Sequence, residues 1–566
     1  MMKLRFLRNL GIPLIILQLL ASCNGPLDQV YQPTVVGTPP YNAFIGLTRL
    51  DNGEIRHYNY GEGNKEGTSY YLRSMDNGFT WDSVAVENKW IGADVKSPLT
   101  GEYVRLETGE NGVLAVRSNG GIDGDWTKTQ VYEAQEDEGS YIMLKPPVFI
   151  REGKRILVGA HSTARFGCGV FYSDDDGLSW KRSQFVQSPP HQPGGVHKGT
   201  RWNHGAVEPT VIELNDGRIW MLARTAQDQH YESFSEDGGE TWSPLKPSSF
   251  YGTITMPTMK RLKDGQLLFI WNNTTPLPEK EGVNGVWEDV FTNRDVLHAA
   301  ISEDDGKTWT GFRELFLNPN RNDPNFGVAD QSLSLDMSVH QNQSVELPGG
   351  KVLVSLGQHR DHRKMLLFDP EWLKETTRED DFRNGLDTWT TFLYQKGIIG
   401  HCAYNREEGA RLVTDPTDAS KQVLKIARRD SETLEIATQG AVWNFPALQK
   451  GRFSTSVYIP ENSQGGRISL SDRWFNPSDT TAYKFAMYNY PLDGLQENKW
   501  HTLHFNYDFG TENKNCVVTD ENGKEVASIP LNYETIHGLS YVHFISTAQQ
   551  EDPHGFLVGP VKSSDK

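Results

Sequence analysis

The sequence predicts an all-β protein in which a six-bladed β-propeller is followed by a β-sandwich of the jelly-roll type. Three observations lead to this prediction. A turn motif ending in tryptophan recurs four times, a turn followed by a strand recurs six times, and after about residue 380 plain alternating strands replace both. The composition agrees with the prediction, because 53 glycines and 29 prolines supply the many turns that such folds need.

Length and charge exclude several other classes of protein. At 566 residues the chain is longer than one ordinary domain, which favours two or more units. Lys and Arg number 56 against 73 Asp and Glu, so the net charge is −17. That balance argues against general nucleic-acid binding, which requires a basic surface. Hydrophobic residues make up only 37% of the chain, which excludes a multi-span membrane protein.

The first 22 residues are typical of a secretory signal peptide. Lys3, Arg5 and Arg8 precede the apolar run 11–20, which is too short to span a membrane. The run leads into Leu-Ala-Ser before Cys23, a pattern similar to the bacterial lipobox. We therefore expect a bacterial lipoprotein lipidated at Cys23, held at the outer membrane and facing the periplasm or the cell surface. The alternative is a secretory signal without lipidation.

The repeated turn motif reads S-x-D-x-G-x-[ST]-W. Its four copies span Ser74–Trp81, Ser173–Trp180, Ser235–Trp242 and Ser302–Trp309. The Asp can accept backbone N–H groups within the turn, and the Gly allows a positive φ. The motif lacks the bidentate Glu of an EF-hand loop, so we expect a structural turn and no calcium site.

A second periodic unit consists of a short polar turn and a half-buried strand. It occurs at Asp51–Ile55, Glu110–Leu114, Glu152–Ile156, Asn215–Ile219, Lys263–Leu267 and Pro348–Val352. Six such units predict six blades. The second blade has only a degenerate box at Ser118–Trp126, and the sixth has none. We expect the outer strand of the sixth blade to come from elsewhere and close the ring.

The C-terminal region alternates apolar and polar residues in segments such as Arg452–Tyr458 and Trp500–Tyr507, and resembles concanavalin-like jelly rolls. Its tryptophans could stack on sugars, although core packing is expected for most of them. The four are Trp389, Trp443, Trp474 and Trp500. The expected segments are a signal peptide at 1–22, a tether at 23–34, the propeller at 35–374 and the sandwich at 375–566. The polar stretch Thr376–Asp381 is predicted to be a protease-sensitive linker.

The four motifs resemble the Asp-boxes, or BNR repeats, of the sialidase superfamily. In that family a Glu at the start of one strand activates a tyrosine nucleophile, and three arginines hold the substrate carboxylate. Glu208 and Arg224 match the Glu and one of these arginines by type and spacing, and Arg294 resembles the third. The resemblance implies a catalytic Glu208 with Arg224 and Arg294 as substrate ligands. The alternatives are a structural ion pair for Glu208 and Arg224, and a surface salt bridge for Arg294.

The sequence also departs from the family pattern. No Arg occupies the usual triplet position within Tyr41–Arg49, and His340 stands where the last-blade tyrosine is expected. We assign His340 and Asp336 as further catalytic candidates, although Asp336 could also be a turn cap. His204 and Arg363 are candidate substrate ligands. Arg363, like Arg360, could replace the missing arginine, and the alternative is a solvated pair. The spacings of His and Cys indicate no metal site and no cofactor.

These features predict an enzyme. The first hypothesis is a sialidase-like exo-glycosidase that removes terminal acidic sugars, sialic acid or another carboxylated sugar, from glycans. The second is a polysaccharide lyase or a His-dependent glycosidase acting on uronate-containing glycans. The third is a non-catalytic glycan-binding surface lipoprotein. The expected partners are an acidic oligo- or polysaccharide and, through the lipid anchor, a membrane, with no nucleic acid.

Overall fold

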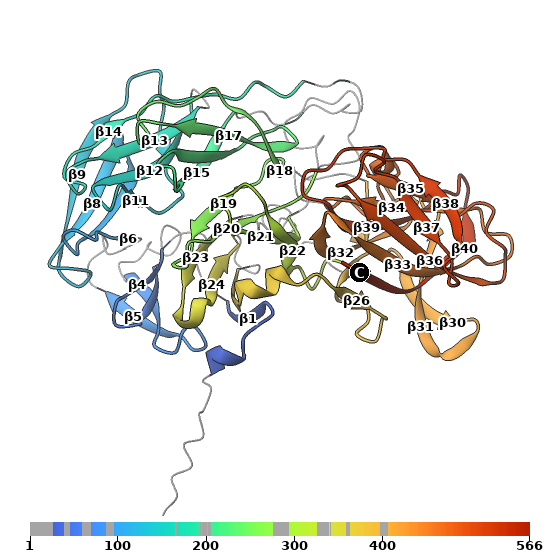
Figure 1. Cartoon of the computed structure of the whole chain (residues 1–566). Helices are drawn as coiled ribbons and strands as arrows, with labels where there is room; N and C mark the ends of the chain where they lie inside the picture. The colour runs from blue at the N-terminus through green and yellow to red at the C-terminus, as the bar shows by residue number, and fades with distance from the viewer. Residues whose placement is uncertain are drawn as a thin grey trace, which may run out of the picture.

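The computed structural model is almost entirely β (Figure 1), which confirms the predicted fold class. It describes residues 26–38, 46–58, 69–86, 95–164, 167–192, 194, 201, 205–275, 294–324, 339, 341–357, 363–396 and 406–566. Within these residues, the helices are short 3₁₀ turns at Pro26–Gln29, Pro348–Gly350, Pro370–Lys374 and Ala482–Lys484. In this part of the chain, no helix has the length and apolarity needed to span a membrane.

Six antiparallel sheets follow one another along the first two thirds of the chain. The first two contain β2 (Leu47–Arg49), β3 (Ile55–Tyr58), β4 (Ser69–Ser74) and β5 (Asp82–Val86), then β6 (Val95–Lys96), β7 (Tyr103–Gly109), β8 (Gly112–Asn119) and β9 (Asp125–Glu133). The third contains β10 (Tyr141–Ile142), β11 (Val148–Ile150), β12 (Arg155–Ser162), β13 (Cys168–Ser173) and β14 (Lys181–Arg182). The fourth contains β15 (Val207–Glu213), β16 (Ile219–Arg224), β17 (Gln229–Ser235) and β18 (Lys246–Tyr251).

The last two sheets of this series complete the arrangement. The fifth contains β19 (Thr258–Arg261), β20 (Leu267–Trp271), β21 (Val296–Ser302) and β22 (Thr310–Leu317), and the sixth contains β23 (Asn342–Glu346), β24 (Val352–Leu356) and β25 (Lys364–Phe368). The outer edge of the sixth sheet is β1 (Thr34–Gly37), which pairs antiparallel with β25. A strand from the start of the chain therefore joins the last sheet, as the missing sixth box predicts.

Apolar clusters join each sheet to the next. Phe171 and Leu106 belong to a cluster between the second and third sheets, and corresponding clusters lie between the third and fourth, fourth and fifth, and fifth and sixth. Further clusters join the sixth sheet to the first and the first to the second. Because burial of apolar side chains is the main stabilising term in folding, these contacts bind the six sheets into one body. The closed six-bladed ring itself stays a prediction.

The four boxes form the predicted turns. In the first, Ser74 Oγ donates to Asp76 Oδ1 at 2.8 Å, and the N–H of Thr80 donates to the same oxygen at 2.9 Å. Gly78 adopts φ 95°, and the Trp81 indole N–H donates to its carbonyl at 2.9 Å. The other boxes repeat the Ser–Asp bond and the glycine at positive φ.

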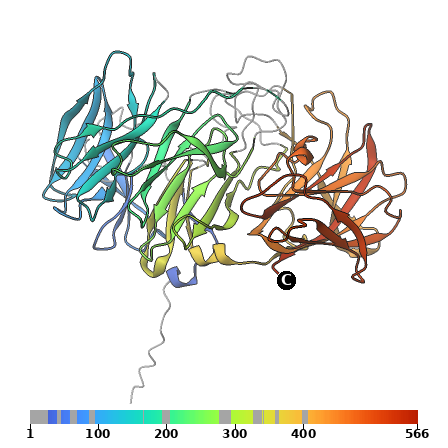
Figure 2. The same cartoon turned by 45° about the horizontal axis from the view of Figure 1, so that its top comes forward.

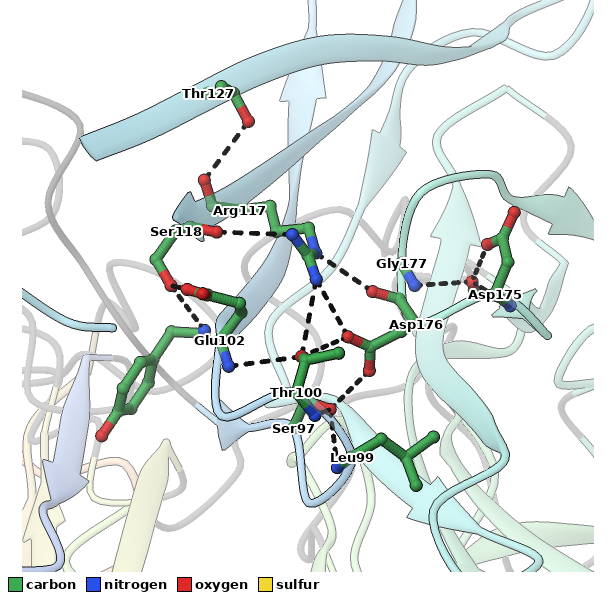
Figure 3. Close-up of polar contacts among 12 residues, drawn as sticks. Ser97, Leu99, Thr100, Glu102, Arg117, Ser118, Thr127, Asp175, Asp176 and Gly177 are labelled. Carbon is green, nitrogen blue, oxygen red and sulfur yellow. Dashed lines mark hydrogen bonds and ion pairs between the residues drawn. The ribbon is translucent and has the colours of Figure 1, made fainter. Parts of the chain in front are cut away.

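One box also anchors its sheet to the preceding one. Asp176, in the box of the third sheet, accepts from Ser97 and Thr100 at 2.5 Å each, and its Oδ2 lies 3.0 Å from Nη2 of Arg117 (Figure 3). All three partners belong to the second sheet or to its turns. The boxes are therefore part of the contacts between neighbouring sheets at the rim, in addition to closing their own hairpins.

Replacing Asp237 by Ala should lower the thermal midpoint of unfolding at pH 7. Burial alone would raise the pKa of this carboxyl, but hydrogen bonds from Thr241, Ser235 and Glu240 lower it to about 2. Losing these bonds should cost about 1–3 kcal/mol. Since the folded pKa lies below the unfolded value, the stabilisation is present above about pH 4 and is lost as the pH falls towards 2.

Differential scanning calorimetry across this pH range checks the prediction, with Glu236→Ala as the control. Glu236 is the exposed neighbour in the same turn. A midpoint difference between Asp237→Ala and the parent that persists unchanged at pH 2 would contradict the proposed carboxylate role.

The C-terminal third folds as two facing sheets and a small hairpin. One sheet contains β26 (Arg378–Asp380), β30 (Arg411–Asp415), β31 (Asp418–Arg428), β40 (Asp552–Ser564), β33 (Lys450–Tyr458), β36 (Trp500–Asp508), β37 (Cys516–Thr519) and β38 (Glu525–Ile529). The other contains β27 (Trp389–Thr390), β32 (Gly440–Leu448), β39 (Leu539–Ser546), β34 (Gly466–Ser471) and β35 (Tyr488–Pro491), and the hairpin is β28 (Leu393–Tyr394) with β29 (Arg406–Glu407). One apolar core fills the space between the two sheets. The predicted sandwich strands are present.

The sandwich packs against the fifth sheet of the series. Figures 1 and 2 both place the orange-to-red strands beside green β19–β22, and β22 and β32 are in direct contact. A chain of hydrogen bonds crosses this interface. His298 Nδ1 accepts from a backbone N–H, so Nε2 carries the proton and donates to Tyr541 Oη at 2.6 Å. Tyr541 then donates to Glu314 at 2.8 Å.

Half of the predicted linker is a strand in the structure. Arg378–Asp380 forms β26, which pairs with β40, and Arg378 donates to the Asn444 carbonyl at 2.7 Å. Thr376, Thr377 and Asp381 are exposed and lie outside any strand, so an open backbone of the kind that proteases require is confined to them. Its polar composition reflects its place between two sheets, with Glu379 and Asp381 exposed and Arg378 part-buried.

Candidate functional site

Glu208 occupies an irregular position near the start of β15. The pairing of β15 with β16 shifts between Val207 and Thr210, so Glu208 and Pro209 form a bulge. Glu208 also adopts φ 50°, which is uncommon for a residue with a side chain. Bulges and positive φ values redirect side chains, occur at functional sites, and persist only where the surroundings hold them. The backbone therefore aims this carboxylate in a direction that a regular strand would not give.

Arg224 meets Glu208 directly. It ends β16 and pairs across the sheet with Val207, and its Nη1 donates to both carboxylate oxygens of Glu208 at 3.0 Å each. The exposed fractions of the two side chains are 7% and 10%. Burial opposes ionisation of Glu208, but the surrounding cations, first Arg224, outweigh it and hold the pKa of the carboxyl below its usual value. Glu208 is therefore a carboxylate at neutral pH.

His161 contacts the same residue from the third sheet. It lies near the end of β12, and its Nδ1 accepts the backbone N–H of Glu208 at 3.2 Å. This bond requires an unprotonated Nδ1. Burial lowers the pKa of His161 to about 4, so the ring is neutral at physiological pH. His161 thus supports the bulge that carries Glu208.

Lys145 is a residue that the sequence analysis missed. It precedes β11, donates to Thr258 Oγ1 and interacts electrostatically with Glu208. Burial lowers its pKa to about 7, against the opposing effect of the Glu208 charge. Lys145 lies three residues before β11, the first strand of its hairpin with β12. Glu208 has a similar position in the next sheet, at the start of β15. A basic residue at that place is the sequence signal that could have identified it.

A small cavity next to Lys145 marks where four sheets converge. It has a volume of about 60 Å³ and is lined by residues of β15, β19 and β23 and of the segment around β11, among them Thr210, Lys260 and Asn342. That volume holds about two water molecules and no sugar. Strands of the third to sixth sheets therefore line one small cavity beside Pro209, the residue after Glu208.

Of two further buried arginines, Arg201 contacts the segment that follows Arg224 directly, and Arg294 is linked to it through Ile254. Arg201 donates to the carbonyl of Ala226 at 3.0 Å and to Asp228 Oδ1 at 2.7 Å. Arg294 donates to the carbonyl of Ile254 at 3.1 Å, and the N–H of Ile254 donates to Thr225. Arg201, Arg224 and Arg294 are 2%, 6% and 5% exposed. All three side chains are therefore buried, and Arg294 is separated from Thr225 by the backbone of Ile254.

Some of the predicted site residues lie within the described part of the chain, and others lie outside it. Glu208 and Arg224 are in contact, and Arg294 is joined to the residue after Arg224 through Ile254. Arg363 is buried just before β25. His204, Asp336 and His340 lie outside the described residues. In the part of the chain that is described, no group of three or more His, Cys, Asp or Glu could hold a metal ion.

Comparison with known proteins agrees with the repeats. Residues 123–323 match the BNR repeat-like domain. Over 151 residues the chain is 27% identical to an anhydrosialidase of the leech Macrobdella decora, a match that covers 26% of this chain and 18% of the relative. The chain therefore matches about a fifth of that relative's length.

Among solved structures, Trypanosoma rangeli sialidase in complex with sialic acid is similar with 12% identity and a TM-score of 0.36, covering 93% of this chain and 91% of that one. A protein of unknown function from Dyadobacter fermentans is similar with 18% identity and a TM-score of 0.39, covering 60% of this chain and 98% of that one. The BNR repeat-like domain at 123–323, with the leech relative, confirms the resemblance to the sialidase superfamily that the Asp-boxes predict.

Proposed function

We propose that this protein is a sialidase-like exo-glycosidase that hydrolyses terminal acidic sugars, sialic acid or another carboxylated sugar, from glycans. The observation that carries the proposal is the buried pair of Glu208 and Arg224, which match the Glu and one of the carboxylate-binding arginines of the sialidase pattern. Lys145 also interacts electrostatically with Glu208. Basic groups in a poorly solvated place favour an anionic ligand, because charge interactions strengthen as water is excluded.

Glu208 is assigned the role of a base in this proposal. A carboxyl whose pKa lies below its usual value is ionised at neutral pH and can accept a proton, but it is a poor proton donor. This agrees with the family role in which the Glu activates a nucleophile. The name of the leech relative, an anhydrosialidase, makes sialic acid the first substrate to try.

Lys145 favours a second candidate, a lyase acting on uronate-containing glycans. An amine with a pKa of about 7 is half deprotonated at neutral pH and can take a proton from carbon, while the arginines neutralise the uronate carboxylate. Elimination leaves a carbon–carbon double bond in the product, whereas hydrolysis does not. The two reactions are therefore distinguishable by their products.

Incubation of the protein with sialylated oligosaccharides and with uronate-containing polysaccharides tests the proposal. We expect new reducing ends without new ultraviolet absorbance, because hydrolysis adds water across the glycosidic bond. Ultraviolet absorbance rising with the reducing ends would favour the lyase. Tight binding of an acidic glycan without any product would leave the protein as a non-catalytic binder and contradict both enzyme proposals.

The placement of the protein in the cell is a further proposal. It rests on the sequence alone: lipidation at Cys23 would hold the chain at the outer membrane through the tether 23–34. The division into a propeller at 35–374 and a sandwich at 375–566 is proposed on the same basis. A membrane-anchored enzyme would act on glycans that reach the cell surface or the periplasm.

A further inference from the structure

Trp500 differs from the other tryptophans that the sequence analysis considered for sugar stacking. Trp389, Trp443 and Trp474 are at most 1% exposed and belong to the apolar clusters of the sandwich and of its interface with the fifth sheet. Trp500 is the first residue of β36 and is part-exposed. Its indole N–H donates to Asp415 Oδ1 at 3.2 Å and to Thr417 Oγ1 at 3.1 Å. The ring is therefore held in one orientation at the surface.

The sheet face around Trp500 carries hydroxyl-bearing side chains. Because side chains alternate along a strand, every second residue of β33 and β36 points away from the sandwich core. The pairing sets Tyr458 opposite Trp500 and Ser456 opposite Thr502, with 3.0 Å between the two hydroxyl oxygens. The Tyr458 and Trp500 ring centroids are 5.5 Å apart. Aromatic rings and hydroxyl groups thus lie side by side on this face.

Two adjoining hollows lie over this face. One, of about 580 Å³, is lined by Trp500, Lys421 and Gly559 among others, and the second, of about 650 Å³, includes Thr502 and Lys562. Both include Ser456, so they form one elongated depression. Each volume is in the range of small-ligand sites, and together they have room for more than one sugar unit.

Gly559 forms part of the floor beside Trp500. A β-carbon at this position would lie 3.3 Å from the Trp500 ring and 3.3 Å from the Ser456 β-carbon. Such contacts are tight, so a larger residue would push the indole out of its place. The absence of a side chain at 559 lets Trp500 lie close to the sheet.

The charge of the depression excludes an anionic ligand. Its cations are each paired with a carboxylate: Arg383 with Asp381 at 2.9 Å, Lys421 with Asp418 at 3.0 Å and Lys562 with Glu379 at 2.9 Å. Asp380 and Asp415 also lie in the lining and add negative charge. A carboxylated sugar would be repelled here, in contrast to the surroundings of Glu208.

We propose that this depression is a second carbohydrate site, which binds an uncharged glycan chain by stacking one sugar on Trp500 and hydrogen-bonding its hydroxyl groups to Ser456, Thr502 and the paired charges. It is a binding site without chemistry and does not depend on the reaction proposed at Glu208. The sandwich would hold the enzyme on a neutral backbone while the other site acts on acidic termini.

Affinity electrophoresis of the full chain tests this site. The gels contain soluble β-glucan, galactan, xylan or mannan, or the acidic polymer polygalacturonate, and the protein carries Glu208→Gln so that turnover plays no part. We expect retardation by at least one neutral polymer. Polygalacturonate should cause no retardation that depends on Trp500. Trp500→Ala should weaken that retardation about tenfold or more, as expected when a central aromatic contact is truncated.

Two further variants separate binding from folding. Trp500→Phe keeps a ring but loses the indole N–H, and should bind with intermediate strength. Trp126→Ala is the matched control, since it removes another part-exposed indole whose N–H is bonded, here to the Ile122 carbonyl at 3.1 Å, in the second sheet. It should bind like the parent. Equal retardation of Trp500→Ala and the parent, or no retardation by any neutral polymer, would overturn the proposal whether or not the glycosidase is active.

Discussion

Replacing Glu208 by Gln should reduce turnover of an acidic glycan by about 10²–10⁴-fold while its binding stays close to that of the parent. Gln keeps the shape of the side chain and an oxygen that can accept from Arg224. It cannot carry the negative charge or take up a proton, and our proposal requires both. Initial rates from released reducing ends give kcat and KM, and calorimetry of the bound glycan gives Kd.

Glu213→Gln is the matched control for this experiment. It makes the same change at the other end of β15, where Glu213 accepts the backbone N–H of Arg151 at 3.1 Å. Activity like that of the parent is expected. If Glu208→Gln also turns over like the parent, the chemistry lies elsewhere and the Glu208–Arg224 pair is structural, the alternative that the sequence left open.

Removing Arg224 would be a less clear test than removing the Glu208 charge. Loss of one partner of a buried ion pair leaves the other charge unpaired, at a cost of about 3–5 kcal/mol in stability. Arg224→Ala would also take away the cation that contributes most to the low pKa of Glu208. A fall in activity could then come from lost binding, from a protonated Glu208 or from partial unfolding. Glu208→Gln changes only the charge.

Features that depend on neighbouring residues could be predicted from the sequence. The Asp-box is closed by bonds between residues no more than four positions apart, such as Thr80 to Asp76 and Gly78 to Ser74. All the residues that form these hydrogen bonds therefore lie within eight consecutive positions of the sequence. For this reason the sequence predicts the turns correctly. The Glu208–Arg224 contact also follows from local pairing, since the two residues lie at matching ends of one hairpin.

The rest of the site depends on sheets that meet only after folding. Lys145, His161 and Arg201 come from separate segments, and no short motif joins them to Glu208. The direction of the Glu208 side chain depends on a bulge that regular alternation does not reveal. In the sandwich, the sequence does not show which of four tryptophans could bind a sugar. The structure distinguishes Trp500, because the other three side chains are buried.

The interface between the fifth sheet and the sandwich could also not be predicted from patterns in the sequence. Asn444 lies in an apolar strand, where alternation gives no reason for an amide. The structure supplies one, because Asn444 accepts the N–H of Glu314 at 3.1 Å and donates to the carbonyl of Phe312 at 3.0 Å. Both partners lie in β22, across the interface. Polar residues buried between two units satisfy backbone groups that water reaches when the units are apart.

A fragment ending at Lys374 should therefore fail to fold by itself. Without the sandwich, Phe312 loses the ring of His537, which stacks at 4.6 Å, and Glu314 loses Tyr541. Asn273 loses the backbone of Asp472 and Trp474, to which it bonds at 2.8 and 3.0 Å. A largely apolar face with several unmatched polar groups would be exposed on the fifth sheet. Expression of residues 26–374 should give insoluble protein or a chain without cooperative thermal unfolding.

Asn444→Ala in the full chain provides a graded form of the same test. It leaves the Glu314 N–H and the Phe312 carbonyl without their partners, which should cost about 1–3 kcal/mol for each group and lower the midpoint of unfolding. Asn506→Ala is the control, because Asn506 bonds to Arg452 on the outer face of the same sandwich, away from the interface. A soluble 26–374 fragment with a sharp unfolding transition, together with an Asn444→Ala midpoint equal to that of Asn506→Ala, would establish that the six sheets stand alone and that the interface only docks two independent units.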